Sequence, residues 1–362
     1  MGMMNPRDNI SMFQFIMLLS VAISAVGFLD IRGIAKDITI NTWIPVLLTL
    51  FISPLFIWVT LKLAAVFPEK IIISYLPEIT GKHLGFILGF FLNLYYLLIS
   101  AIAFKLFMEI TRVYLLVKTP LEVMIFVQLL VLLFASWQGI NSIARFTELT
   151  IPMLTFLFFF FILITIIDCD LANIFPIAEN GLLPVLKKVS FTLPNYLAIG
   201  LISFLYPFIN RKNKLTKPVL SAILVTGGII FLLDLNIVGV FGEEIADLYF
   251  PSIAVFQRIN IPFMFIERIV LFLLLTILPI LFIFNLLTYF VSALGFTTLF
   301  NLRDHTVFTL LLLPLYFLII NIPISVADVF WLRETARWAA VIVLFLPVIL
   351  LVIVKFKKRM IG

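Results

Sequence analysis

The stretch LTIPMLTFLFFFFILITII, residues 149–167, runs without a single charged side chain. A helix needs about 20 apolar residues to cross the hydrocarbon of a bilayer. Runs of similar length recur along the chain, which is 63% hydrophobic and only 12% charged. Soluble domains average about 45–50% apolar and about 25% charged residues. The chain is therefore predicted to be an all-α integral membrane protein, because lipid can solvate an apolar excess that water cannot.

Outward from this stretch, the chain divides into ten predicted spans separated by proline and glycine. They lie at about 11–34, 42–66, 84–111, 120–138, 149–168, 190–210, 218–241, 265–297, 306–326 and 336–356. We interpret residues 1–362 as one transmembrane domain with two five-helix halves, about 11–168 and about 190–356. The count allows a LeuT-like 5+5 inverted repeat, in which helices 1 and 6 are broken. The sequence shows no clear internal repeat, so the span count is compatible with this plan but does not demonstrate it.

Basic clusters set the predicted orientation, because loops rich in lysine and arginine remain in the cytoplasm. One cluster occupies the loop at 211–217 and another the tail at 355–359, and ten spans place both on the same side as the N-terminus. The acidic segment 243–247 falls on the opposite side. Both termini of this multi-pass protein are thus predicted to be cytoplasmic.

Two spans contain residues that favour a break. Residues 24–28 of the first span include Gly27, which lowers helix preference and lets a ligand approach the backbone. An unwound stretch there would aim free N–H groups at a carboxylate, whereas close helix packing is the alternative interpretation. The sixth span contains Pro194, Asn195 and Gly200, which suit either a broken helix or an ordinary kink.

Few ionisable side chains lie within the spans, and such residues often mark functional sites. Lys105 and Glu109 stand four residues apart in the third span, so they share a helix face and can pair. The pair is interpreted either as a polar gate or as a structural brace. Asp234 in the seventh span is interpreted either as a cation or proton site or as a buried hydrogen-bonding group.

The sequence lacks the residues that several classes of function require. The single cysteine, Cys169, excludes an intramolecular disulfide, and His83 and His305 lie far apart, so no metal site is predicted. There is no nucleotide-binding glycine loop and no Ser/His/Asp arrangement, so neither an enzyme nor a cofactor is expected. The net charge of +6 resides mainly in clusters beside the spans, which argues against nucleic-acid binding.

Ordered motifs along nearly the whole chain carry a family resemblance. The most specific block is Pro251-Ser252-Ile253, then Phe256-Gln257, followed by Phe265-Ile266-Glu267-Arg268. Lys105-x3-Glu109 precedes Thr119-Pro120, and Gly139 precedes Arg145 and Pro152. In this order and spacing the chain resembles the B subunit of Ger-type spore germinant receptors, within the amino acid–polyamine–organocation transporter superfamily.

The resemblance implies a receptor subunit in the inner membrane of a bacterial spore. Such a subunit binds a small nutrient germinant, often an amino acid, and acts with A and C subunits to trigger germination. By position, the resemblance places the following residues in the ligand pocket: Ala25, Val26, Gly27, Phe28, Tyr95, Ile99, Ala198, Ile199, Gly200, Leu201, Ile283, Phe284 and Asn285.

Two departures from the family pattern bear on the ligand. The small-x-Gly element reads Ala25-Val26-Gly27, without a first glycine, and Leu201 stands where the family has a carboxylate. Both changes predict a bulkier or less polar germinant than alanine. A secondary amino-acid transporter coupled to protons or sodium is the alternative function, since one fold serves both, and a scaffold for other membrane subunits is a third.

Overall fold

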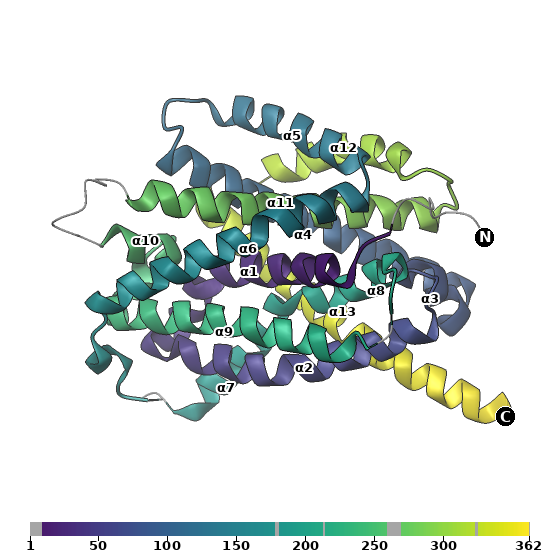
Figure 1. The fold of residues 1–362 in the computed structure, drawn as a ribbon, viewed down its shortest axis with the longest axis horizontal. Helices are drawn as coiled ribbons and strands as arrows, with labels where there is room; N and C mark the ends of the chain where they lie inside the picture. Colours follow the sequence, from purple (N-terminus) through teal and green to yellow (C-terminus); the bar gives the residue numbers. More distant parts are fainter. Residues whose placement is uncertain (1–8, 178–180, 213, 259–268, 323–324, 362) are drawn as a thin grey trace.

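The computed structural model describes residues 9–177, 181–212, 214–258, 269–322 and 325–361 (Figure 1). Helices account for most of this chain. The α-helices are α1 (Met12–Ile38), α2 (Trp43–Val66), α3 (Ile72–Thr80), α4 (Lys82–Tyr114), α5 (Leu121–Trp137), α6 (Ile140–Thr165), α7 (Leu182–Thr192), α8 (Ala198–Leu205), α9 (Thr216–Phe241), α10 (Pro251–Gln257), α11 (Ile269–Leu299), α12 (His305–Asn321) and α13 (Val326–Ile361).

The predicted membrane architecture is confirmed. Among the described residues, eight helices are long and apolar enough to cross a membrane, and the apolar helices α5 and α12 have 17 residues each. Together they correspond to the ten predicted spans. The 33 residues of α4 extend about 50 Å at 1.5 Å per residue, so this helix tilts or projects beyond the hydrocarbon. Glu267 and Arg268, at the predicted start of the eighth span, lie outside the described residues.

The first span is unbroken, contrary to the prediction of an interrupted helix 1. Helix α1 runs continuously through Gly27. A Cβ atom on Gly27 would stand 2.9 Å from Cγ2 of Ile230 in α9, so the missing side chain lets two helices approach closely. Gly27 therefore serves packing and not unwinding, which was the alternative interpretation.

The sixth span is interrupted, as predicted, but by a 3-10 turn flanked by residues with right-handed helical angles and not by an unwound stretch. It begins at Leu182, earlier than expected, behind Gly181, whose φ of +89° favours glycine. Helix α7 then gives way to a 3-10 turn, η4 (Leu193–Tyr196), before α8 continues the span. Pro194 lies in η4 and lacks the backbone N–H that a regular helix would use. The break thus lies inside an apolar span, where it is tolerated because neighbouring helices surround it.

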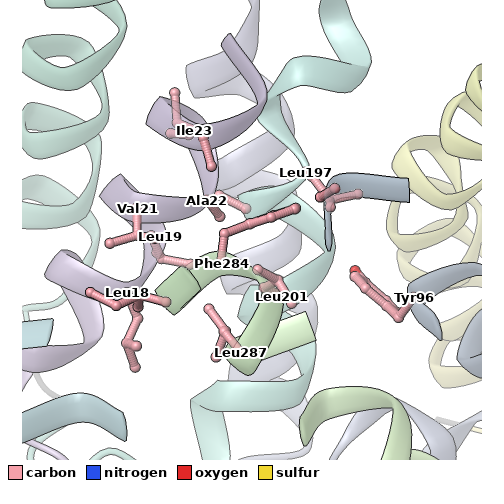
Figure 2. Packing of buried hydrophobic residues seen from close by; sticks show 14 of the residues in the cluster. Leu18, Leu19, Val21, Ala22, Ile23, Tyr96, Leu197, Leu201, Phe284 and Leu287 are labelled. Atoms are coloured by element: carbon pink, nitrogen blue, oxygen red, sulfur yellow. The ribbon is translucent and has the colours of Figure 1, made fainter. Parts of the chain in front are cut away.

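Helix α1 runs through the middle of the bundle, packed against α6, α8, α9 and α11 (Figure 1). Helices α5 and α12 lie along one side of the bundle, and α2, α7 and α9 along the other. Figure 2 shows the interior beside α1, where Phe284 and Leu287 of α11 approach Leu201 of α8. This apolar packing fixes the position of the span-six break relative to α1.

Candidate functional site

A cavity lies at the break in span six, between α1, α4, α11 and α13. It measures about 50 Å³. One water requires about 10–15 Å³ by this measure, so the cavity has room for several waters or a small solute. It is lined by Ala25, Val26, Leu29, Tyr95, Ile99, Ile102, Ala103, Leu106, Pro194, Asn195, Leu197, Phe284, Arg333, Arg337 and Ala340. We call it the central cavity.

Most of the central cavity wall is apolar. Helix α4 contributes a stripe from Tyr95 through Ile99 to Leu106, whose spacing follows one face of a helix. Phe284 closes the wall from α11, and α1 contributes Ala25 and Leu29. Such a wall favours an aliphatic or aromatic group, whose burial gains roughly 25 cal/mol per Å² of apolar surface.

Two arginines of α13, together with Asn195, form the polar part of the wall. Arg333 donates from Nη1 to the Leu29 carbonyl oxygen (2.6 Å) and from Nη2 to that of Val26 (3.0 Å). Arg337 is buried and donates from Nη1 to the Phe191 carbonyl oxygen (2.5 Å), with its guanidinium over the Phe191 ring. These bonds tie α13 to α1 and to the end of α7, next to the break.

Sequence reasoning missed both arginines as site residues. The predicted tenth span began at residue 336, so Arg333 fell in a loop and Arg337 at an interface. In the structure α13 begins earlier, at Val326. The available signal was their spacing, because two arginines four residues apart share one face of a helix.

The predicted pocket residues divide into three groups. Ala25, Val26, Tyr95, Ile99 and Phe284 line the central cavity. Gly27 and Phe28 line two neighbouring cavities. The others lie in the packed interior around it: Ala198, Ile199, Leu201, Ile283 and Asn285 are fully buried, and Gly200 closely approaches Tyr96. Whether any of them binds a ligand stays a prediction.

Lys105 and Glu109 are both buried, and the predicted contact between them is present. Lys105 Nζ lies 4.0 Å from Glu109 Oε1, while Arg112 Nη2 lies 2.7 Å from Glu109 Oε2. Glu109 thus faces two cations on its own helix, α4. This arrangement favours a structural brace, because the carboxylate is already paired by neighbours within one turn.

Asp234 of α9 lies in a second, smaller cavity of about 20 Å³. We call it the Asp234 cavity; its polar lining residues are Asp234, Thr49, Thr192, Asn195 and Tyr196. Asn195, in the 3-10 turn, lines both this cavity and the central cavity. The break in span six therefore stands between the two.

Comparison with known proteins points to one family. A family model described as "Spore germination protein" matches residues 9–329. Spore germination protein YndE of Bacillus subtilis (strain 168) is 25% identical over 99% of both chains. Spore germination protein A2 of the same organism is 26% identical over 96% of both chains, and protein B2 is 24% identical over 95% of both.

A solved structure shares the fold. Mhp1, a nucleobase-cation-symport-1 family transporter in a closed conformation with bromovinylhydantoin bound, superposes with a TM-score of 0.57 at 14% identity. The match covers 91% of this chain and 78% of that one. It confirms the predicted LeuT-like fold class, and at this identity it shows the fold alone.

Proposed function

This chain belongs to the spore germination protein family, and from that premise we propose that it is the B subunit of a germinant receptor. In this proposal the protein spans the spore inner membrane with both termini in the cytoplasm. It binds a small nutrient molecule, an amino acid, from the outer side. Binding acts on partner A and C subunits to trigger germination.

The central cavity is the observation that carries the proposal. It places an apolar wall beside guanidinium donors and an amide, next to a break in a membrane span. Pockets for small molecules typically combine an apolar lining with a few well-placed polar groups. Guanidinium groups form strong, directional hydrogen bonds with carboxylates, so Arg337 suits the carboxylate of an amino acid. The stripe from Tyr95 to Leu106 suits its apolar side chain.

Ligand binding would act through the break. A solute in the central cavity would touch α1, α4 and α13 and, at Pro194 and Asn195, the turn η4. A ligand shifts a conformational equilibrium only if it contacts two states differently. The segment η4 is suited to such a change because it joins the two helical halves of span six, α7 and α8. We propose that this movement is the signal passed to the partner subunits.

The test is a thermal-shift screen of amino acids on the purified protein, since a ligand that binds the native state raises its apparent stability. Branched or aromatic amino acids are expected to raise the Tm, and alanine is not. Ala103→Trp, which fills the central cavity, should abolish the response. Val131→Trp, a matched substitution on the exposed surface of α5, should retain it. An undiminished response in Ala103→Trp would place the ligand elsewhere.

Secondary transport is a second candidate, favoured by the fold shared with a symporter. Uptake into proteoliposomes separates the two functions. A receptor is expected to bind the amino acid without accumulating it, whereas a permease would accumulate it for as long as a proton or sodium gradient lasts.

A further inference from the structure

Asp234 is a fully buried carboxylate, and only one of its two oxygens has a hydrogen-bond partner among the described residues. Its Oδ1 accepts a hydrogen bond from Thr42 Oγ1 at 3.1 Å. Its Oδ2 is buried and has no hydrogen-bond partner within the described residues. No described lysine, arginine or histidine forms an ion pair with it. An uncompensated buried charge costs several kcal/mol, so the carboxylate requires a counter-charge or a proton.

Neutral oxygen atoms surround the same cavity. The hydroxyls of Thr49 and Thr192 form a short mutual hydrogen bond, and both lie within hydrogen-bonding distance of the Pro45 carbonyl oxygen, at 2.7 and 3.2 Å. Two hydroxyl protons are thus shared among these contacts, and each hydroxyl oxygen keeps a lone pair. In the described part of the chain the Asn195 side chain makes no hydrogen bond, so its amide oxygen is also available.

The volume of the Asp234 cavity and the charge of Asp234 indicate which ion the cavity can bind. The cavity measures about 20 Å³, and one water needs about 10–15 Å³, so it holds a single particle of that size. Carboxylate, hydroxyl and amide oxygens are ligands for hard cations. Divalent ions usually draw additional carboxylates, and Asp234 is the only acidic residue that lines this cavity among the described residues. One negative charge balances one positive charge.

We propose that the Asp234 cavity binds one sodium ion, with Asp234 as its counter-charge and Thr49, Thr192 and Asn195 as neutral oxygen ligands. This site is separate from the germinant site. It requires no amino acid and is measured without one, so its failure would leave the proposed receptor function untouched.

The proposed sodium site is placed so that ion binding there can affect ligand binding in the central cavity. Asn195 lines both cavities and belongs to the turn that interrupts span six. A sodium ion held by its amide oxygen would fix the side chain and the turn in one arrangement. The ion and the small molecule would then influence each other's affinity through this residue.

The experiment measures sodium binding to the purified full chain without added amino acid. At constant ionic strength, replacing choline chloride with sodium chloride is expected to raise the Tm in a saturable manner. Radioactive sodium should bind with the same midpoint. Asp234→Asn should lose both responses. Glu148→Gln, which alters a carboxylate that accepts from Gln14 Nε2 elsewhere in the bundle, should keep both.

Two results would overturn the proposal. One is an identical Tm in sodium and choline, or a sodium response that persists in Asp234→Asn. The other is stabilisation in choline by acidification alone that matches the sodium effect, which would mean that a proton neutralises Asp234. If Asp234→Asn fails to fold, Thr192→Val provides the test. This substitution leaves the negative charge of Asp234 in place but removes the Thr192 hydroxyl, one of the proposed sodium ligands. It should weaken sodium binding about 10–100-fold, and unchanged affinity there would contradict the site.

Discussion

The Arg337 side chain links α13 to the end of α7 and also faces the central cavity. Its buried guanidinium, on α13, hydrogen-bonds the carbonyl oxygen of Phe191 at the end of α7 and lines the central cavity. The same group therefore holds the segment before the break and faces the proposed ligand. A loss of this side chain should be visible both in stability and in ligand binding.

We predict that Arg337→Met weakens binding of the germinant by about 1.5–3 kcal/mol, the range for hydrogen bonds to charged groups. Arg337→Lys should retain part of the affinity, because it keeps the charge but loses the planar fork and the stacking on Phe191. Ligand titrations followed by Tm measure both. The control is Lys62→Met, which removes a cation stacked on Trp58 away from the cavity. Equal affinities in Arg337→Met and the wild type would exclude the arginine from ligand binding.

The predicted residues that line the central cavity were placed there by the family resemblance, whereas side-chain chemistry alone singled out only residues unusual for a span. Asp234, Lys105 and Glu109 stand out because ionisable residues in apolar runs are rare. Arg333 and Arg337 did not, since arginines near the end of a span are ordinary at a membrane interface. Asn195 was visible as part of a candidate break, but its place between two cavities depends on helices that are distant in the sequence.

At the scale of the helix, the same kind of signal led to two outcomes. Small or helix-breaking residues in spans one and six predicted two interruptions, and only span six has one. Pro194 removes a backbone donor from its own turn, but proline alone does not decide the outcome, since Pro152 and Pro279 lie inside continuous α-helices. Gly27 only permits a break, and here Ile230 of α9 fills the space beside it. The sequence of α1 cannot reveal which neighbour it meets.

The contacts that a Cβ atom would make at each glycine therefore predict how strongly an alanine substitution destabilises the protein. Gly27→Ala should destabilise the protein by about 1–3 kcal/mol, because the new methyl group would meet the Ile230 side chain at 2.9 Å. Ile230→Ala in the same chain should relieve most of this cost. Thermal unfolding in detergent measures both variants, and a double mutant less stable than Gly27→Ala would contradict the packing role.

Gly85→Ala should be more damaging than Gly27→Ala. Its Cβ would stand 2.5 Å from the backbone of Pro77, and backbone cannot turn away as a side chain can. The contact joins α3 to α4, so these helices must separate to accept the methyl group. Gly228→Ala is the matched control, since nothing lies within 4 Å of its Cβ position. It should match the wild type or be slightly more stable, because alanine favours helix over glycine. An order of stability other than Gly228→Ala, Gly27→Ala, Gly85→Ala would show that these distances do not govern packing.

For the molecule as a whole, hydropathy predicted the ten spans because every spanning segment must be long, apolar and internally hydrogen-bonded. The cavities were beyond such reasoning, since they depend on which faces of α1, α4, α9 and α13 meet. Both cavities adjoin the sixth span, at its 3-10 turn. The proposed sodium ion and amino acid would thus be separate ligands that contact one and the same turn, η4.

This arrangement predicts reciprocal coupling between the two ligands. Sodium should tighten amino-acid binding by about 5–150-fold, and the amino acid should tighten sodium binding by the same factor, because linkage is symmetric. Calorimetric titration of each ligand, with and without the other, measures both factors.

Asn195→Ala should bring both coupling factors close to one, because it removes the side chain that lines both cavities. Arg337 and Asp234 still supply a polar group for each ligand in this variant. A matched change at a residue that lines only the central cavity, Ile99→Ala, should weaken amino-acid binding but leave the coupling factor unchanged. Coupling that survives in Asn195→Ala would mean that the two cavities communicate through the packed helices and not through the turn.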